Sequence, residues 1–110
     1  MSYDELAFFN QQLATMLREG IPLEGALKQL SVGMRAGPLR SELQQLEQDL
    51  TQGAPLAEAL SRRTLPAFYV RMLQIGVRSN DLPGMLLMLA DHYGRAHALW
   101  TRLTTREYRP

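Results

Sequence analysis

By residue type, His92 and His97 are the side chains in this chain best suited to binding a metal ion or transferring a proton. They stand five positions apart in a stretch with helical periodicity, which places them on different helix faces. Two ligands of one metal ion usually stand three or four positions apart on a helix. Asp91 adjoins His92, but neighbouring helical residues diverge by about 100°. The spacing predicts that neither histidine is a metal ligand.

Other catalytic patterns are equally weak in the sequence. The acidic residues are scattered singly, most of them on predicted solvent faces, so no carboxylate pair is indicated. The glycines punctuate predicted helices and follow no predicted strand, unlike those of a phosphate-binding loop. The serines lack the context of a nucleophile elbow, and without cysteine there are no disulfides or thiolate metal sites. We therefore expect no enzymatic activity, no cofactor and no metal.

Composition indicates a folded protein of modest size. The chain has 110 residues, of which 45% are hydrophobic and 21% charged, as in a single globular domain spanning residues 1–110. The net charge of +1 argues against a nucleic-acid binder, which usually has a concentrated basic surface. No apolar run approaches the roughly 20 residues of a membrane span, and the start lacks the features of a secretory signal. From these features alone, the chain is expected to be soluble and not exported.

One eight-residue pattern occurs twice and organises the predicted helices. Residues 20–27 and 53–60 share the frame Gly-x-Pro-Leu-x-x-Ala-Leu. A glycine after a periodic segment can end a helix in the left-handed conformation, and a proline two residues later suits the first turn of the next. Leucine, alanine and leucine at the following spacing form one buried helical stripe. The pattern predicts two helical hairpins built on the same plan.

The remaining periodicity predicts an all-α fold, a six-helix bundle of three helical hairpins with a long C-terminal helix. We expect the first helix over 3–19, the second from Pro22, the third from Pro38 to Gly53, the fourth after Pro55, the fifth from Pro66 to a corner at 76–81, and the sixth from about 82 beyond 103.

Several side chains receive specific expectations. Ser2 and Glu5 are expected to form a capping box, Asn10 to face solvent, and Phe68 and Ile75 to be mostly buried. Asn80 is expected to adopt the left-handed conformation and Asp81 to cap the last helix. Trp100 is expected to anchor the core, and five methionines, Met16, Met34, Met72, Met85 and Met88, to fill it.

Two features of the last helix favour a binding role. The C-terminal stretch is rich in arginine, with only two acidic residues beside Arg95, Arg102, Arg106 and Arg109. This composition fits either a helix C-terminus or the flank of a membrane span. Gly94 lies inside the helix, where glycine costs about 1 kcal/mol relative to alanine. Close approach of another helix, within the bundle or in a dimer, would explain it, and Tyr93 beside it offers further packing surface.

The spacing of these residues resembles one known family. Leu6-x-x-Phe9 through Gly20-x-Pro22-Leu23, the second Gly-x-Pro-Leu repeat, and Leu65-Pro66-x-x-Tyr69-Val70-x-Met72-Leu73-x-x-Gly76 are similar to the cytoplasmic domain of type II secretion system protein F. The same domain occurs in the inner-membrane platform protein of type IV pilus machines. The resemblance covers nearly the whole chain.

The resemblance implies a non-catalytic scaffold on the cytoplasmic side of the bacterial inner membrane. Its expected partners are a secretion or pilus ATPase, other inner-membrane assembly proteins, pilin-like subunits and a second copy of itself. Membrane helices would lie outside this chain, with Tyr108-Arg109-Pro110 as the approach to the first. In the family's usual corner Glu stands where this sequence has Val77, and Gly where it has Asn80. We therefore expect no cation site at this corner.

The candidate contact residues are Arg78, Ser79, Asn80 and Asp81 at the predicted corner, Tyr93 and Gly94 in the last helix, and Arg102 and Arg106 toward its end. The alternative function is a free-standing soluble helical adaptor. The two hypotheses place different residues after Pro110. About 20 hydrophobic residues there favour the platform domain, and polar sequence favours the adaptor.

Overall fold

The computed structural model describes the backbone of residues 2–107 and the side chains of residues 2–104. Tyr108-Arg109-Pro110, the expected approach to a membrane span, therefore lies outside the described residues, as does the side chain of Arg106. The described chain confirms the predicted all-α, six-helix fold. Its helices are α1 (Tyr3–Arg18), α2 (Leu23–Val32), α3 (Pro38–Thr51), α4 (Leu56–Ser61), α5 (Ala67–Arg78) and α6 (Leu82–Glu107).

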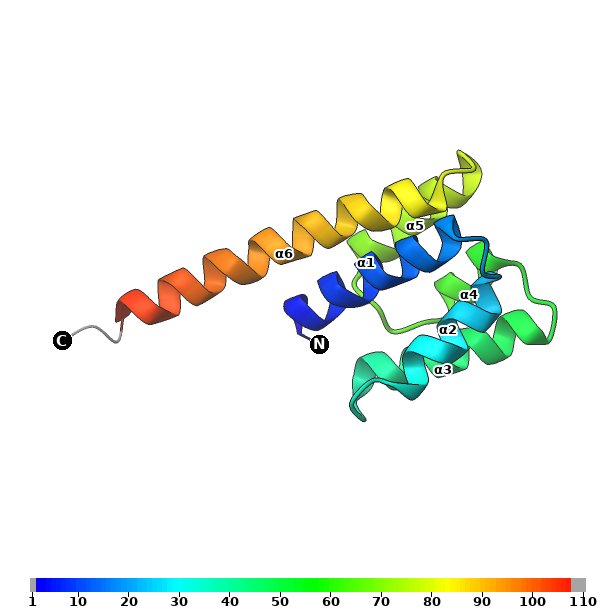
Figure 1. Cartoon of the computed structure of the whole chain (residues 1–110), viewed down its shortest axis with the longest axis horizontal. Helices are drawn as coiled ribbons and strands as arrows, with labels where there is room; N and C mark the ends of the chain where they lie inside the picture. Colours follow the sequence, from blue (N-terminus) through cyan, green and yellow to red (C-terminus); the bar gives the residue numbers. More distant parts are fainter. Residues whose placement is uncertain (1, 108–110) are drawn as a thin grey trace.

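The long helix α6 packs along α1, and this contact is the most extensive in the molecule. Each helix also contacts the next one along the chain, so the α1–α6 contact joins the two ends of the series. Figure 1 shows α6 continuing well past the start of α1, so that its last turns project from the bundle. The molecule is accordingly elongated, measuring 55 × 29 × 26 Å.

The core contains leucines from all six helices, together with a few aromatic and small residues. The leucines of α3 are spaced four, three and four positions apart, so they form a single buried stripe. The buried apolar residues are Leu6, Phe9, Leu13, Ala14, Met16, Ala26, Leu27, Leu39, Leu43, Leu46, Leu50, Ala59, Leu60, Tyr69, Leu73, Leu86, Leu89 and Tyr93.

Three helices end in corners with the same hydrogen-bonding pattern. Gly20, Gly53 and Asn80 have positive φ angles of 89°, 96° and 55°. At each corner the next residue donates its backbone N–H back across the last turn: Ile21 to Met16, Ala54 to Asp49, and Asp81 to Gly76, at 2.9–3.1 Å. These bonds define the Schellman motif. The predicted left-handed conformation of Asn80 is confirmed, and this corner repeats the two glycine corners.

The prolines lie one residue earlier than predicted. Pro22, Pro55 and Pro66 are extended residues that precede α2, α4 and α5, with ψ between 134° and 145°. Their carbonyl oxygens accept the first helical hydrogen bonds, at 2.9–3.1 Å. They act as N-caps, and the expected place in the first turn is wrong for these three. Pro38 does occupy the first turn of α3, as predicted.

The last corner is shorter than the predicted range of 76–81, because α5 continues to Arg78. Gly76 is buried inside this helix against α6. A Cβ atom placed on it would lie 2.8 Å from the Cβ of Met85. Gly76 therefore permits a close approach of α5 and α6. The sequence pattern could not distinguish this role of the glycine from a role in a turn.

Two expectations for α1 are wrong. Ser2 precedes the helix, but its hydroxyl contacts the carboxylate of Asp4, and its side chain makes no capping bond to the backbone, so no capping box forms. Asn10 was expected to face solvent and is fully buried. Its Oδ1 accepts a hydrogen bond from the hydroxyl of Tyr69. A polar side chain can be buried when such a partner is available.

Several apolar side chains expected in the core are exposed. Phe68 and Ile75 are about half exposed, and Trp100 lies in the projecting part of α6, so it does not anchor the core. Four of the five methionines are buried or partly buried as predicted, and Met88 is exposed.

An ionic cluster joins α3 to the segment after α4. The guanidinium of Arg63 lies 3.4 Å from a carboxylate oxygen of Glu42 and 3.6 Å from one of Asp49. Glu42 also accepts a hydrogen bond from the backbone of Thr64 at 3.2 Å. All three charged side chains are mostly buried, so the cluster fixes where the chain turns between α4 and α5.

Candidate protein-binding surfaces

The corner between α5 and α6 is exposed from Arg78 to Asp81. Two of its polar side chains bind the backbone locally. Asp81 Oδ1 accepts a hydrogen bond from the N–H of Gly84 at 3.0 Å, which confirms the predicted helix cap. The hydroxyl of Ser79 donates to the carbonyl oxygen of Ile75 at 2.9 Å. The corner is thus a well-ordered turn that presents Arg78 to solvent.

Tyr93 and Gly94 are neighbours in α6 but have different environments. Tyr93 is buried, with its ring 5.4 Å from that of Tyr3 and 6.0 Å from that of Tyr69. Burial raises the pKa of the Tyr93 hydroxyl, and Tyr3 raises it further. Gly94 is half-buried at the surface, and a Cβ atom added there would lie 4.0 Å from the nearest side-chain atom, the Cβ of Ala7. The packing of the bundle therefore does not require a glycine at 94.

Gly94 lines a shallow groove between α1 and α6, which we call the α1–α6 groove. Its volume is about 520 Å³. Small side chains make up much of its floor, and charged side chains stand at its edges, including an ion pair of 2.7 Å between Arg95 and Asp91. The lining residues are Asp4, Ala7, Phe8, Gln11, Leu87, Ala90, Asp91, Gly94, Arg95, His97 and Ala98.

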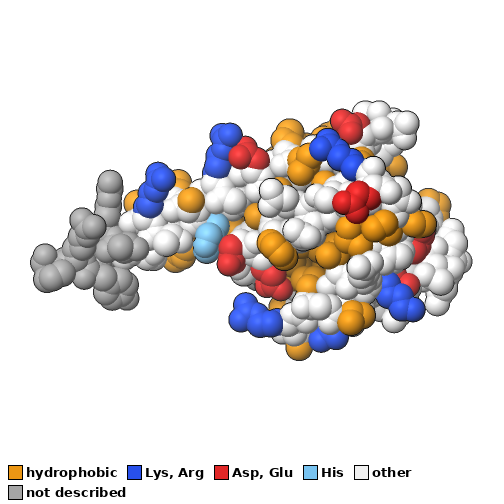
Figure 2. All heavy atoms as spheres, in the orientation of Figure 1, with side chains coloured by type: hydrophobic (Ala, Val, Ile, Leu, Met, Phe, Trp, Pro, Cys, Tyr) orange, Lys and Arg blue, Asp and Glu red, His pale blue; other side chains and the backbone are white. Residues whose placement is uncertain are grey.

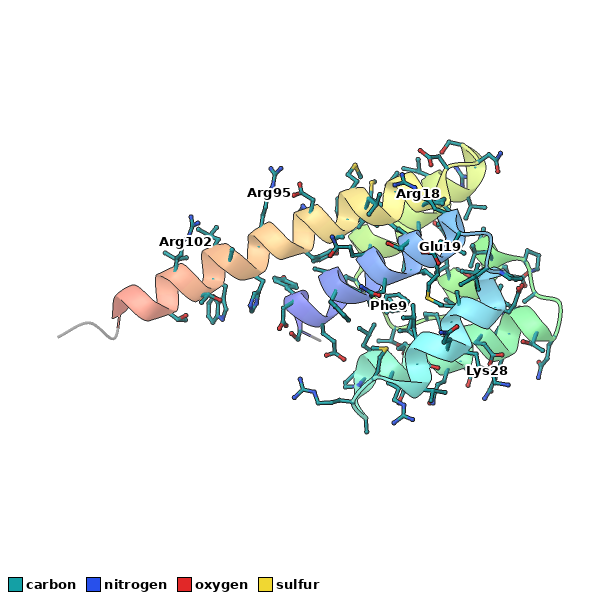
Figure 3. The ribbon with its side chains drawn as sticks, in the orientation of Figure 1. Phe9, Arg18, Glu19, Lys28, Arg95 and Arg102 are labelled. Atoms are coloured by element: carbon teal, nitrogen blue, oxygen red, sulfur yellow. The ribbon has the colours of Figure 1, made fainter. Side chains whose placement is uncertain are left out.

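Arg102 lies in the projecting part of α6 and is exposed. Figure 3 shows Arg95 and Arg102 extending from the same side of this helix, away from α1. The backbone of Arg106 continues the helix one turn further, and its side chain is outside the described part. Most of α6 lies between the corner at Arg78 and Arg102, and its residues from Leu82 to Arg102 extend over roughly 30 Å at 1.5 Å per residue. The structure therefore does not bring the predicted contact residues together into one site.

Sequence reasoning missed a second set of exposed residues. Phe68 and Ile75 on α5, and Met88 and Leu99 on α6, are each exposed by 45% or more. One signal was present in the sequence: Arg71 and Arg78 follow Phe68 and Ile75 by three positions and share their helix face. A buried face rarely alternates large apolar residues with arginines.

The titratable side chains of the described residues are dispersed over the structure. No three histidine, aspartate or glutamate side chains among them gather closely enough to hold a metal ion. The hydrogen bond from Ser2 lowers the pKa of Asp4, a carboxyl at the edge of the α1–α6 groove.

No helix within the described part is both long and apolar enough to cross a bilayer.

Comparison with known proteins gives a consistent family. The profile of the family "Type II secretion system (T2SS), protein F" matches residues 9–106. The type IV pilus assembly protein TapC of Aeromonas hydrophila is 26% identical over 108 residues, which cover 96% of this chain and 26% of that protein. Type II secretion system protein F of Xanthomonas campestris is 32% identical over 96 residues, 86% of this chain and 24% of that protein. The type IV pilus assembly protein PilC of Thermus thermophilus is 36% identical over 88 residues, 79% of this chain and 22% of that protein. The chain spans about a quarter of the length of these relatives.

Proposed function

This chain belongs to the type II secretion system protein F family, and we propose that it acts as a non-enzymatic assembly-platform domain in a type II secretion or type IV pilus machine. The observation that carries the proposal is the family match, which extends over residues 9–106 of 110. The relatives bear the names of secretion and pilus assembly proteins. A compact helical bundle that exposes charged and apolar helix faces suits a docking role.

The proposed partners are the cytoplasmic ATPase of the machine, its other inner-membrane assembly proteins and its pilin-like subunits. In this proposal the domain lies on the cytoplasmic side of the inner membrane. Residues 1–110 form one domain of a longer chain, whose membrane spans lie outside these residues. The length of the relatives, about four times that of the matched region, supports this organisation. Reading the gene beyond codon 110 tests it: about 20 consecutive apolar codons support a membrane span there, and a stop codon or polar sequence favours the free-standing adaptor.

Docking to the ATPase can be measured directly. The purified chain should bind the secretion or pilus ATPase from the same bacterium in isothermal titration calorimetry, and should hydrolyse no ATP by itself. Arg78→Glu reverses a charge at the end of α5, and Arg102→Glu reverses one in the projecting part of α6, so a weaker complex with one of them would locate the contact. Lys28→Glu on α2 is the matched control, because it reverses an exposed charge elsewhere on the surface. The absence of binding by the unmodified chain would contradict the docking role.

Self-association through the α1–α6 groove is a further part of the proposal. Gly94 has space beside it that the fold does not use, so a second copy can approach closely there. Gly94→Leu should fill this space and lower the dimer fraction in sedimentation equilibrium. Gly94→Ala is the matched control, because a single Cβ fits without a clash and should preserve more of the dimer. An unchanged mass for Gly94→Leu with unchanged helicity would remove the groove as the interface.

A further inference from the structure

Helix α5 exposes a row of alternating apolar and basic side chains. Phe68 and Ile75 are 46% and 45% exposed and stand seven positions apart, so they share one helix face. Arg71 and Arg78 are also exposed and occupy the same face, three positions after each apolar residue. The row therefore reads apolar, basic, apolar, basic along the outer side of the helix.

Helix α6 carries a similar row over a longer distance. Met88, Leu99 and Leu103 are between 49% and 58% exposed. His92 and Arg95 fill the intervening turns, so that positions 88, 92, 95 and 99 have the four, three, four spacing of one face. Arg102 adjoins Leu103 at the far end. Figure 2 shows hydrophobic side chains beside the basic ones along the part of α6 that projects from the bundle.

A ring contact joins the two rows. The centroids of Phe68 and His92 lie 5.0 Å apart with an interplanar angle of 43°, which places both rows on the same side of the α5–α6 hairpin. We call this surface the α5–α6 outer face. Its members are Phe68, Arg71, Ile75, Arg78, Met88, Asp91, His92, Arg95, Leu99, Arg102 and Leu103. Asp91 and Arg95 lie at the border that this face shares with the α1–α6 groove.

The α5–α6 outer face is strongly basic for a chain whose net charge is only +1. Within the described side chains of α5 and α6, Asp91 is the only acidic residue. Its carboxylate is already paired with Arg95 at 2.7 Å. Arg71, Arg78 and Arg102 are exposed on the same face. The charge therefore favours a negatively charged partner.

From this geometry, we infer that the α5–α6 outer face binds an amphipathic helix of a partner protein, with an apolar stripe flanked by aspartate or glutamate. The large apolar side chains would pack against the partner's stripe, and the arginines would pair with its carboxylates. A row in the four, three, four spacing is narrow, as in helix–helix seams.

An anionic membrane surface is the main competitor, and the pattern disfavours it. A helix that lies on a membrane has a broad apolar face and places its basic residues on the opposite, polar face. Here Arg71 lies between Phe68 and Ile75, and Arg95 lies between His92 and Leu99, within the apolar rows. A helical partner can meet such a row with its own alternation of leucine and glutamate, whereas the lipid interior offers no partner for the charge.

This inference goes beyond the proposed function, because it names the chemistry of the bound segment and holds whichever machine contains the chain. The probe is a fluorescein-labelled synthetic peptide of three heptads, with leucine at the two seam positions and glutamate on both flanks. A second peptide carries lysine in place of each glutamate. In fluorescence anisotropy the acidic peptide should bind at least about tenfold more tightly than the basic one.

Variants of the face should separate its two contributions. Arg71→Glu combined with Arg102→Glu should weaken binding of the acidic peptide by about tenfold or more and reduce its dependence on salt. Phe68→Ser combined with Leu99→Ser should weaken it to a similar extent at every salt concentration. Arg18→Glu combined with Lys28→Glu is the matched control, on exposed positions of α1 and α2, and should leave binding near the unmodified value. Circular dichroism checks that each variant remains folded.

Three outcomes would overturn the inference. The first is equal affinity for the two peptides, or no binding of the acidic one. The second is binding to vesicles of phosphatidylcholine and phosphatidylglycerol that the Arg71, Arg102 double variant abolishes, while the peptide does not bind. The third is a concentration-dependent dimer, dissolved by the Phe68, Leu99 double variant, that competes with the peptide. None of these depends on the ATPase, so failure of ATPase docking and failure of this face can be told apart.

Discussion

Tyr69 and Asn10 make the most demanding contact of single side chains in this fold. Both are buried, and the Tyr69 hydroxyl donates to Asn10 Oδ1 across the packed interior. Asn10 Nδ2 is also buried and has no hydrogen-bond partner among the described residues. A buried polar group without a partner is costly, so either residue alone would destabilise the core.

The two side chains should therefore be coupled in stability. Tyr69→Phe and Asn10→Leu should each lower the free energy of unfolding by about 1–3 kcal/mol, because each leaves the other group unpaired. The double variant should lose less than the sum of the two. Urea denaturation followed by circular dichroism measures all three. Tyr3→Phe, at a half-exposed position, is the control and should stay within about 0.5 kcal/mol of the unmodified protein. Strictly additive losses would contradict the coupling.

Burial of Tyr69 also predicts a loss of stability in alkaline solution. Desolvation raises the pKa of its hydroxyl well above the ordinary value. Above about pH 10 the unfolded chain releases this proton while the folded chain keeps it, so the stabilisation is complete below pH 10 and falls as pH rises further. By pH 11 this effect should lower the free energy of unfolding by about 1.4 kcal/mol. Urea titrations at pH 9 and pH 11 should show the loss, and Tyr69→Phe should show a smaller one. Equal losses in both proteins would exclude Tyr69 as the source.

At the scale of the elements, three equivalent corners set where the helices end. Each relies on one residue with positive φ, and each returns its hydrogen bonds to the preceding turn. Two of these residues are glycines, and the third is asparagine, which tolerates the same conformation better than other side chains. The helices themselves gain most of their stability from the leucine stripes that face the core.

A matched pair of glycine substitutions isolates this backbone effect. Gly53 and Gly25 both have open space where a Cβ atom would go, but only Gly53 has positive φ. Gly53→Ala should lower the free energy of unfolding by about 1 kcal/mol through backbone strain. Gly25→Ala should raise it by up to about 1 kcal/mol, because Gly25 lies inside α2. Thermal unfolding by calorimetry gives both values. Shifts of the same sign would contradict the assignment of strain to the corner.

Features set by neighbouring residues could be predicted from the sequence, and features set by distant contacts could not. Corners and helix types depend on residues close together in the chain, so Gly20, Gly53, Asn80 and Asp81 were predicted correctly. Burial of Asn10 depends on Tyr69, 59 positions away, and no local pattern reveals that contact. Exposure of Phe68 and Trp100 likewise depends on which helices reach them. The candidate contact residues were predicted as separate candidates. The structure places the corner residues beside the start of α6 and Arg102 in its projecting part, because α6 is long.

For the whole molecule, the main asymmetry is between the packed and projecting parts of α6. Leu86, Leu89 and Tyr93 are buried, while residues 98–103 are exposed on all sides. Apolar packing protects the first part, whereas the second part is exposed and its backbone depends mainly on hydrogen bonds within the helix. The bundle therefore combines a stable body with a solvated extension that bears part of the α5–α6 outer face.

This asymmetry predicts a gradient of amide hydrogen exchange along one helix. Amides of residues 86–93 should exchange only on global unfolding, whereas those of residues 98–104 should exchange by local fraying and much faster. Exchange measured by NMR on the free chain tests the gradient. Bound acidic peptide should slow exchange at residues 98–104, and the matched basic peptide should not. Uniform protection along α6 would show that something else covers the extension.

The continuity of α6 has a mechanical consequence. No proline interrupts the helix after Pro83, so α6 forms one continuous arm beyond the tyrosine contacts around Tyr93 whenever its last turns are not frayed. From Tyr93 to Thr104 the arm is roughly 16 Å long at 1.5 Å per residue, so a tilt of about 10° at Tyr93 displaces the tip by about 3 Å. A force applied at the tip would conversely be transmitted as a torque to α1, the helix against which α6 packs.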